Sequence, residues 1–443
     1  MRATLRHPAR LVPLAFLFAI SAGTVLLMLP ISRAGDGSAP PLTALFTSTS
    51  AVCVTGLIVE DTPVYWSRFG QAVIMGLFQI GGFGIMTGAT LLGLLVTQRI
   101  RLRDRLVAQA ETKTLGLGNV ASVLRLVLMA TVTVEIALAI ILALRFRFAY
   151  HTNWGEAVWH GLFHAISAFN NAGFSTYSNS LMGFAVDPLI VIPIMVAIVL
   201  GGLGFPVLYE LRRDVRRPSR WSVHTKITVA ATGLLLVGGS VAILWSEWTN
   251  PGTLGSFGTG DKMLASAFHS VSARTAGFNS LDVGAFTPET IVVHDMLMFI
   301  GGGSAGTAGG IKVTTFFLLA FVIWAEVRGD PDTTAFGRRI PIAAQRQALT
   351  VALLGVAFVT LGTLALLTLT DFELSDVLFE VISAFATVGL STGITFDLPP
   401  AAQGVIIVLM FVGRVGSITV ATALALRSRK RLYRFPEERP IVG

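Results

Sequence analysis

Eight stretches of the chain are apolar over roughly 20 residues or more, the length at which a helix can cross the hydrocarbon core of a bilayer. Only 13% of the residues are charged, whereas soluble domains carry about 25%. The alternating pattern of a membrane barrel is absent. The sequence therefore predicts an all-α polytopic membrane protein, with spans at 11–30, 70–97, 121–148, 188–211, 227–248, 290–325 (interrupted by glycines), 346–370 and 401–427.

Lys and Arg gather in alternate loops between these stretches. Of the 33 basic residues, 24 lie in one set of loops and five in the other. This asymmetry follows the positive-inside rule, so we expect a multi-pass protein of a bacterial inner (plasma) membrane with both termini in the cytoplasm. Topology also explains the net charge of +8, so the lipid bilayer, and no nucleic acid, is the expected partner. The basic loops are 1–10, 99–113, 212–226, 328–346 and 427–439.

A glycine-centred segment occurs four times. Its central glycines are separated by 117, 104 and 112 residues, and a large apolar residue follows each of them. A second glycine motif follows 24 to 28 residues later, in the next apolar stretch. The general abundance of glycine in membrane helices does not produce this agreement in phase. The four segments are SAVCVTGLI around Gly56, SAFNNAGFS around Gly173, SARTAGFNS around Gly277 and ATVGLS around Gly389.

Each segment is too short to span and stands between two apolar stretches, which predicts a re-entrant half-helix followed by a loop. Because the basic loops lie between the repeats, all four repeats share one orientation and suit a pseudo-fourfold axis, as in a potassium channel. The expected architecture has eight transmembrane helices and four re-entrant half-helices. The predicted span–pore helix–filter loop–span repeats are 1–113, 114–222, 223–340 and 341–443.

Four such loops around one axis suggest a binding site for an ion. Non-helical backbone at membrane depth is tolerated where protein buries it or where it lines a water-filled path. Backbone carbonyls can replace the water around a monovalent cation, and glycine adopts the positive φ that such a loop needs. The partly negative C-terminal ends of four half-helices would also favour a cation. The predicted filter residues are Val54, Thr55, Gly56, Asn171, Ala172, Gly173, Thr275, Ala276, Gly277, Thr387, Val388 and Gly389.

On these motifs the chain resembles the Trk/Ktr/HKT superfamily of potassium transporters, most closely its KtrB-type membrane subunits. VTGL, FNNAGF, RTAGFN and TVGLS look like the four filter segments, and GGIKVTT and GRVG like the other signatures, so the resemblance covers essentially the whole chain. It implies potassium uptake driven by the membrane potential and ion gradients, with potassium at the filter as substrate and no cofactor. It also implies a homodimer, a cytosolic ring of nucleotide-binding regulatory subunits of the KtrA type, and sodium as an activator in some members.

The third repeat contains IGGGSAGTAGGIKVTT at 300–315, where a continuous helix would lose about 1 kcal/mol for each glycine. We expect a loop within the membrane, which the resemblance makes a gate below the filter. A flexible kink or close helix packing is the alternative. A phosphate-binding loop is disfavoured because Ile311 separates Gly310 from Lys312, and Lys312 would lie near the ion path with a carboxylate as one partner. The predicted gate residues are Gly302, Gly303, Ser304, Gly306, Gly309, Gly310 and Lys312.

Arg414 lies inside the last apolar stretch, where a charge is costly and usually functional. The resemblance implies that it projects towards the axis below the filter and lowers ion occupancy there. A pair with Glu380 that holds helices together is the alternative, and the two roles are compatible. Four polar residues break the fourfold symmetry and are expected to brace the filter from behind, with contact to the ion through their side chains as the alternative: Asn170 and Asn171 in the second loop, and Arg274 and Thr275 in the third. Glu135, in the middle of the third apolar stretch, is assigned no role.

No constellation of catalytic residues accompanies these motifs. His160 and His164 lack the Glu of a zinc-protease motif, and the lone Cys53 excludes an intramolecular disulfide. The chain is therefore not predicted to be an enzyme, and an intramembrane hydrolase is a remote alternative. A transporter permeable to sodium or ammonium is the nearer one. Acidic residues near the expected outer mouths could concentrate cations or be ordinary loop charges: Glu60, Asp61, Asp187, Asp261, Asp282, Asp371, Asp376 and Asp397.

Overall fold

Helices form nearly all the regular structure of the computed structural model, which describes residues 8–108, 120–426 and 438. The two-residue strands β1 (Thr334–Ala335) and β2 (Arg338–Arg339) pair as an antiparallel hairpin. The α-helices of the described residues are α1 (Pro8–Leu27), α2 (Pro41–Val52), α3 (Thr62–Tyr65), α4 (Arg68–Ala108), α5 (Val120–Ala149), α6 (Trp154–Asn170), α7 (Pro188–Leu203), α8 (Phe205–Asp214), α9 (Val223–Glu247), α10 (Thr259–Ser272), α11 (Pro288–Phe299), α12 (Val313–Arg328), α13 (Ile342–Leu369), α14 (Leu374–Ala386) and α15 (Pro400–Leu426).

Proline and polar caps mark where several helices begin. Pro188 occupies the first turn of α7, where its missing N–H has no helical partner to lose. The Asp187 side chain caps the same helix by accepting from the amide of Leu189 at 3.0 Å. Asn153 caps α6 by accepting from the amide of Glu156 at 2.8 Å. These local signals set helix starts that hydrophobicity alone locates only approximately.

Within the described residues, four helical segments are long and apolar enough to cross a membrane. They are Arg68–Gly88 of α4, Arg125–Ala149 of α5, and all of α9 and α13. Helices α7 and α8 qualify together as a fifth, although they are bent by 103°. The apolar parts of α1 and α15 are shorter, and α11 and α12 are two halves of the interrupted stretch at 290–325. The layout of eight spans stays a prediction beyond these segments.

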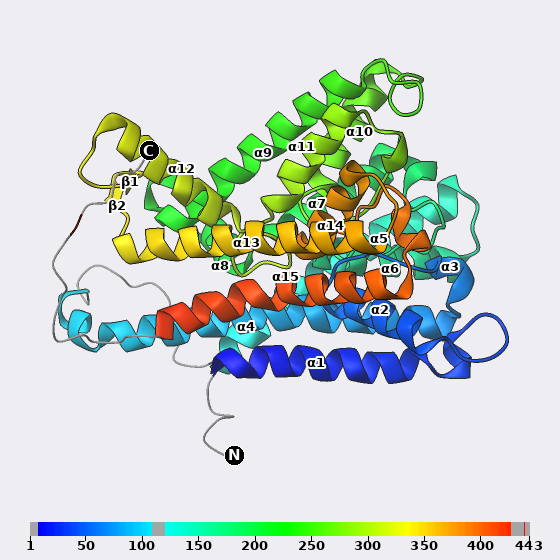
Figure 1. The fold of residues 1–443 in the computed structure, drawn as a ribbon, viewed down its shortest axis with the longest axis horizontal. Helices are drawn as coiled ribbons and strands as arrows, with labels where there is room; N and C mark the ends of the chain where they lie inside the picture. The colour runs from blue at the N-terminus through cyan, green and yellow to red at the C-terminus, as the bar shows by residue number, and fades with distance from the viewer. Residues whose placement is uncertain (1–7, 109–119, 427–437, 439–443) are drawn as a thin grey trace.

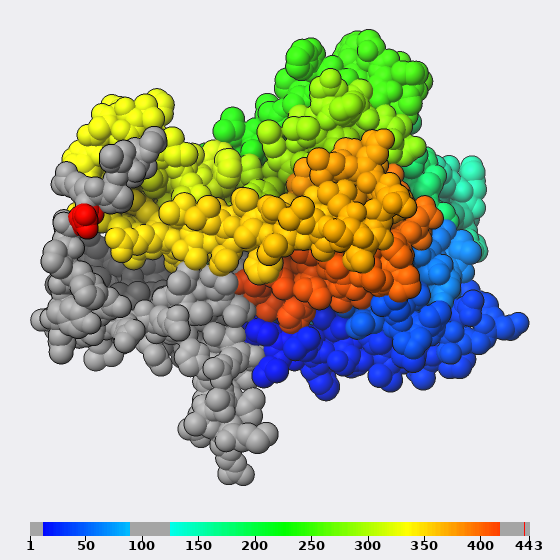
Figure 2. All heavy atoms as spheres, in the orientation of Figure 1, coloured from blue at the N-terminus to red at the C-terminus, as the bar shows by residue number. Residues whose placement is uncertain are grey.

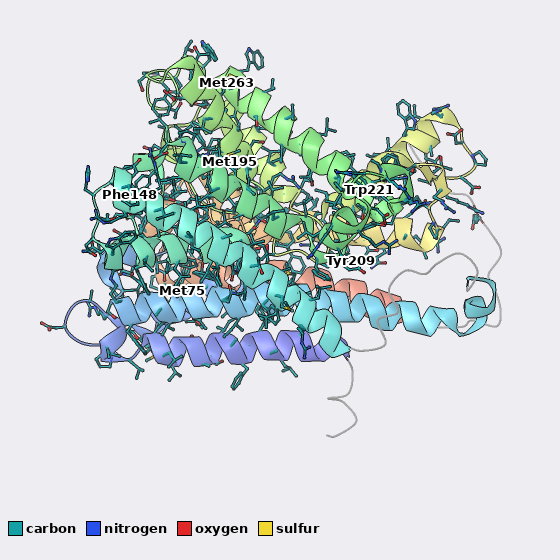
Figure 3. The ribbon with its side chains drawn as sticks, turned by 180° about the vertical axis from the view of Figure 1, so that it is seen from behind. Met75, Phe148, Met195, Tyr209, Trp221 and Met263 are labelled. Atoms are coloured by element: carbon teal, nitrogen blue, oxygen red, sulfur yellow. The ribbon has the colours of Figure 1, made fainter. Side chains whose placement is uncertain are left out.

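The long helices form the body of the molecule. Helices α1, α4, α13 and α15 run along its long axis in Figure 1, with α1 in contact with both α4 and α15. Helices α9 and α11 pack against each other and are tilted relative to this group. Figure 3 shows the opposite side, where α1 and α4 again lie side by side. The short helices α2, α6, α10 and α14 end in the four predicted filter loops.

Large apolar side chains cover much of the outer surface. Helix α13 crosses the face seen in Figure 2 and exposes Leu349, Leu353, Val356, Leu361 and Leu364. A long helix that is apolar on its outer side as well as on its packed side is typical of a transmembrane span. This surface agrees with the predicted all-α membrane protein.

Two expected spans differ from the structure. The stretch predicted at 70–97 is part of a 41-residue helix, α4, which continues to Ala108 because no Gly or Pro interrupts the helix formers that follow. The stretch predicted at 188–211 is not one straight helix. It breaks at Gly204, where φ is 89°, and Pro206 lies in the first turn of α8. The second repeat therefore contains a break that was expected only in the third.

Candidate functional site

The four loop glycines meet in a closed ring. A Cβ added to each glycine would collide with the carbonyl oxygen that precedes the glycine of the next loop, and the order returns from the fourth loop to the first. The four loops are thus arranged so that each glycine lies against a carbonyl of the next loop. The contacts are Gly56 with Ala172, Gly173 with Ala276, Gly277 with Val388, and Gly389 with Thr55.

The four loops also share one backbone conformation. In every loop the glycine has positive φ, from 71° to 98°, and so has the residue two positions before it, from 51° to 74°. The residue between them has negative φ. The sign of φ therefore alternates along each loop in the same way. The left-handed non-glycine residues are Val54, Asn171, Thr275 and Thr387.

A serine near the end of each short helix holds the loop that follows. The hydroxyls of Ser50 and Ser383 accept from the amides of Gly56 and Gly389, both at 3.1 Å. In the other two repeats the hydroxyl donates to the carbonyl after the glycine, from Ser167 to Phe174 at 2.8 Å and from Ser272 to Phe278. These serines are not among the predicted site residues, although a Ser-Ala pair stands five or six residues before each loop glycine.

The third loop is one residue shorter than the others. The serine lies six residues before the loop glycine in three repeats and five before it in the third, at Ser272. With this gap, Phe268 takes the place that phenylalanine occupies in the other repeats. All four rings are fully buried: Phe46, Phe163, Phe268 and Phe379. An alignment that counts the same number of residues back from each loop glycine therefore misses Phe268.

A cavity of about 240 Å³ lies on one side of the ring and is lined by all four loop glycines. Asp61 and Asp282 line it, together with many hydroxyl and amide groups. These two carboxylates can attract cations to the mouth of the ring. Asp187 has a different role, because Arg145 and Tyr150 donate to its carboxylate at 2.8 Å and 2.9 Å. Asp61 and Asp282 thus line the cavity beside the ring, whereas Asp187 serves to hold Arg145 and Tyr150.

The glycine-rich segment of the third repeat lies against the loops. Residues 300–312 form a loop between α11 and α12. Within this loop the amide of Gly309 donates to the Thr275 hydroxyl at 3.1 Å. The Thr307 hydroxyl donates to the carbonyl of Phe169 at 3.2 Å and to the Asn171 side chain at 3.3 Å. The predicted gate loop therefore contacts the second and third predicted filter loops directly.

Two cations hold this loop, the partly buried Lys312 and the buried Arg414. The Lys312 ammonium donates to the carbonyls of Ala308 and Gly309, at 2.5 Å and 3.3 Å. The Arg414 guanidinium donates to the carbonyl of Thr307 at 2.5 Å. Among the described residues, neither has a carboxylate partner of the kind expected from the sequence. Glu380 instead accepts from the Thr395 hydroxyl at 2.5 Å. Backbone carbonyls freed by the broken helix are therefore the partners of both charges.

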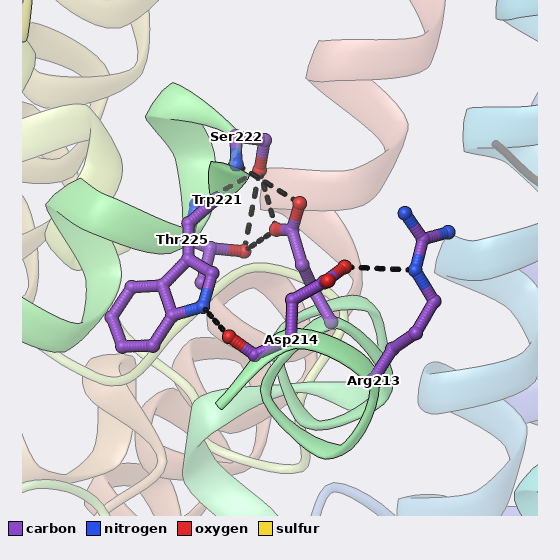
Figure 4. A network of polar contacts seen from close by, with 6 residues as sticks. Arg213, Asp214, Trp221, Ser222 and Thr225 are labelled. Atoms are coloured by element: carbon purple, nitrogen blue, oxygen red, sulfur yellow. Dashed lines mark hydrogen bonds and ion pairs between the residues drawn. The ribbon is translucent and has the colours of Figure 1, made fainter. Parts of the chain in front are cut away.

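Helix α8 of the second repeat contacts the loop at 300–312 and the start of α9, both in the third repeat. At its start, the amide of Phe205 donates to the carbonyl of Ala305 at 3.4 Å. Near its end, Glu210 accepts from the amide and hydroxyl of Ser222 at 2.9 Å and 2.8 Å, and the Trp221 indole donates to the Asp214 carbonyl at 3.0 Å (Figure 4). The bend at Gly204 thus places α8 between the loop and the start of α9.

Replacement of Gly204 by Ala should lower stability. With φ of 89° and ψ of 144°, Gly204 has a backbone conformation that costs a residue with a Cβ about 1–3 kcal/mol, and the new Cβ would collide with the carbonyl of Ser304. We expect the midpoint of thermal unfolding in detergent to fall by several degrees. Gly233→Ala in α9 is the matched control because no atom lies within 4 Å of its added Cβ. Equal midpoints for the two variants would contradict the assigned role of the bend.

Histidine and cysteine side chains of the described residues have structural surroundings. His160 contacts the Thr176 hydroxyl at 2.6 Å, and His164 contacts the Ser175 hydroxyl at 3.0 Å. Cys53 is buried with a free thiol. No group of three His, Cys, Asp or Glu side chains in the described part of the chain could hold a metal ion.

The TrkH family, described as cation transport proteins, matches residues 7–431. The chain belongs to this family. Its members are transporters and not enzymes, and the resemblance predicted from the loop motifs is confirmed. TrkH-family membership also confirms the predicted class of all-α membrane protein, for which the described helices supply the apolar spans.

Relatives within the TrkH family cover nearly the whole chain. The Ktr system potassium uptake protein B of Bacillus subtilis (strain 168) is 39% identical over 439 residues, which are 98% of this chain and 97% of that protein. The protein of the same name from Vibrio alginolyticus is 38% identical over 98% of this chain and 94% of its own length. The crystal structure of the potassium transporter TrkH from Vibrio parahaemolyticus has a TM-score of 0.71, covers 95% of this chain and 85% of its own, and is 19% identical. It has the same fold.

Proposed function

We propose that this protein takes up potassium across the inner (plasma) membrane of a bacterium, through a selectivity filter made of its four loops. The closed ring of four glycines, each against the carbonyl of the next loop, is the observation that carries the proposal. Carbonyl oxygens around one axis can replace the hydration shell of a dehydrated monovalent cation. The two Ktr system relatives named above are potassium uptake proteins, which favours potassium as that cation.

Ion gradients and the membrane potential supply the driving force. Moving one positive charge through 100 mV yields about 2.3 kcal/mol, which corresponds to roughly 50-fold accumulation. With both termini in the cytoplasm, the cavity that contains Asp61 and Asp282 would face outwards. Potassium would then enter through this acidic mouth, lose water at the ring and leave past residues 300–312.

Residues 300–312 are the proposed gate. They lie against the loops through Thr275 and Asn171, and Lys312 and Arg414 hold them through carbonyl oxygens. A cytosolic ring of nucleotide-binding subunits is the proposed regulator, and its docking surface would be the basic cytoplasmic loops of a homodimer. Sodium is a proposed activator of uptake, distinct from the transported potassium.

Cation uptake by purified protein in liposomes tests the proposal. Potassium, rubidium, sodium and ammonium are compared at equal concentration under an inside-negative potential. We expect potassium and rubidium to enter at least about tenfold faster than sodium, a difference of about 1.4 kcal/mol. Equal rates for all four cations would contradict the filter assignment.

Sodium transport is the second candidate function. The potassium/sodium uptake protein NtpJ of Enterococcus hirae is 35% identical over 98% of this chain and 97% of its own length. Uptake of sodium as fast as potassium, with ammonium excluded, would favour this candidate. Stimulation of potassium uptake by sodium that does not itself accumulate would instead support sodium as the activator.

A further inference from the structure

A buried carboxylate lies directly behind the second loop. Glu135 on α5 is 5% exposed. Its carboxylate oxygens accept from the Gln79 amide and from the Asn170 amide, both at 3.1 Å. Asn170 also donates to the Gln79 side-chain oxygen at 2.5 Å, so the three side chains form a closed triangle. An acidic residue at membrane depth is costly and rarely kept without a function.

This triangle has no basic member. The ion pairs among the described residues are Arg145–Asp187, Arg213–Asp214, Arg328–Asp330 and Arg339–Asp332, and none includes Glu135. Two amides therefore satisfy the carboxylate. Such a group stabilises a particular arrangement of its partners more than it stabilises the fold as a whole, because a buried carboxylate loses its hydration.

The arrangement that Glu135 stabilises is that of the second loop. Asn170 is the last residue of α6 and is followed by Asn171, whose left-handed φ of 59° begins the loop. Ala172 then contributes its carbonyl to the ring. A Cβ on Gly82 of α4 would collide with the Asn170 side chain, so this glycine leaves the space that the triangle needs. Glu135 is thus connected to the ring through one side chain and two peptide units.

Equivalent positions show that only two loops have such a brace. Three residues before the loop glycine stand Cys53, Asn170, Arg274 and Ala386. Arg274 donates to the carbonyl of Gly301 at 3.1 Å, which ties the third loop to the loop at 300–312. Cys53 and Ala386 have no comparable polar group. Glu135 therefore serves the second loop alone.

We propose that Glu135 is a positioning residue that holds the second loop at the distance suited to potassium. The inference rests on the proposed filter. A carbonyl ring whose loops resist moving inwards favours potassium over the smaller sodium ion by fit. Without the Glu135 carboxylate, Asn170 keeps its bonds to the Gln79 side chain and to the Ile166 carbonyl but loses its third acceptor. The second loop is then held less firmly and can close around sodium. The role is one of specificity, since Glu135 does not contact the ring itself.

The Glu135→Leu and Gln79→Leu variants test this role in liposomes. We expect the potassium-to-sodium ratio of uptake to fall about tenfold in either variant, as the loss of a hydrogen bond to a charged group allows. The double variant should fall no further, because the two residues act through one network. Glu135→Gln, which keeps the shape and one acceptor, should show a smaller fall.

Glu247 supplies the matched control. It is buried like Glu135, but its carboxylate accepts from Asn250 and Thr287 at the end of α9. Glu247→Leu should leave the uptake ratio unchanged, whatever it does to the amount of folded protein. A fall in total uptake with a constant ratio in both Glu135→Leu and Gln79→Leu would overturn the proposal. A wild-type protein that does not prefer potassium would overturn the proposed function first, and the positioning role with it.

Discussion

Gly389→Ser is expected to reduce the potassium-to-sodium uptake ratio at least about tenfold. Gly389 has φ of 98°, a conformation that costs other residues about 1–2 kcal/mol. Its added Cβ would collide with the carbonyl of Thr55, which belongs to the ring, and would lie 3.1 Å from the Cα of Gly56. Displacement of one carbonyl by a few tenths of an ångström changes the fit to a dehydrated ion. Uptake of rubidium, used in place of potassium, and of sodium into liposomes measures this ratio.

Gly393→Ser separates the effect of the ring from that of backbone strain. Gly393 has a similar φ of 110°, but no atom lies within 4 Å of its added Cβ. We expect this control to lose some stability and to keep its preference for potassium. If both serine variants lost the preference equally, strain alone would explain the result. If neither lost it, the ring would not be the filter.

Arg414→Gln should raise the rate of potassium uptake about tenfold. The Arg414 side chain is 2% exposed and donates to the carbonyl of Thr307. Its removal therefore frees the loop at 300–312. It also takes a positive charge away from the proposed ion path. Two unit charges about 4 Å apart repel by roughly 4 kcal/mol at an effective dielectric constant of 20, well above the 1.4 kcal/mol that a tenfold change needs. Initial rates of rubidium uptake at equal amounts of folded protein measure the effect.

Lys262→Gln is the control for this variant. Lys262 is also buried and donates to a backbone carbonyl, that of Trp248 at 2.6 Å, but it lies in the first turn of α10 and has no contact with the loop. Its rate should stay unchanged. An unchanged or slower rate in Arg414→Gln, with its potassium preference intact, would show that Arg414 does not limit passage.

Much of the site was predictable because its requirements are local. Each loop needs a glycine at a position of positive φ, and this need leaves the same mark in every repeat, as at Gly56 and Gly389. The run of glycines after Ile300 likewise predicts a broken helix from residue type alone. Constant spacing hid the shorter third loop, however, and with it Phe268 and the serine of that repeat.

The sequence by itself determined the membrane class, the four glycine-centred loops and the interruption at 300–312, because hydrophobicity and the freedom of glycine belong to single residues. Only the tertiary structure decided which groups meet. Arg414 reaches a carbonyl 107 residues away, at Thr307, and Glu135 reaches Asn170 35 residues away. Polar groups buried in a membrane must find partners wherever the fold brings them. The pairing of charges with carbonyls and amides, instead of with opposite charges, therefore could not be read from composition or spacing.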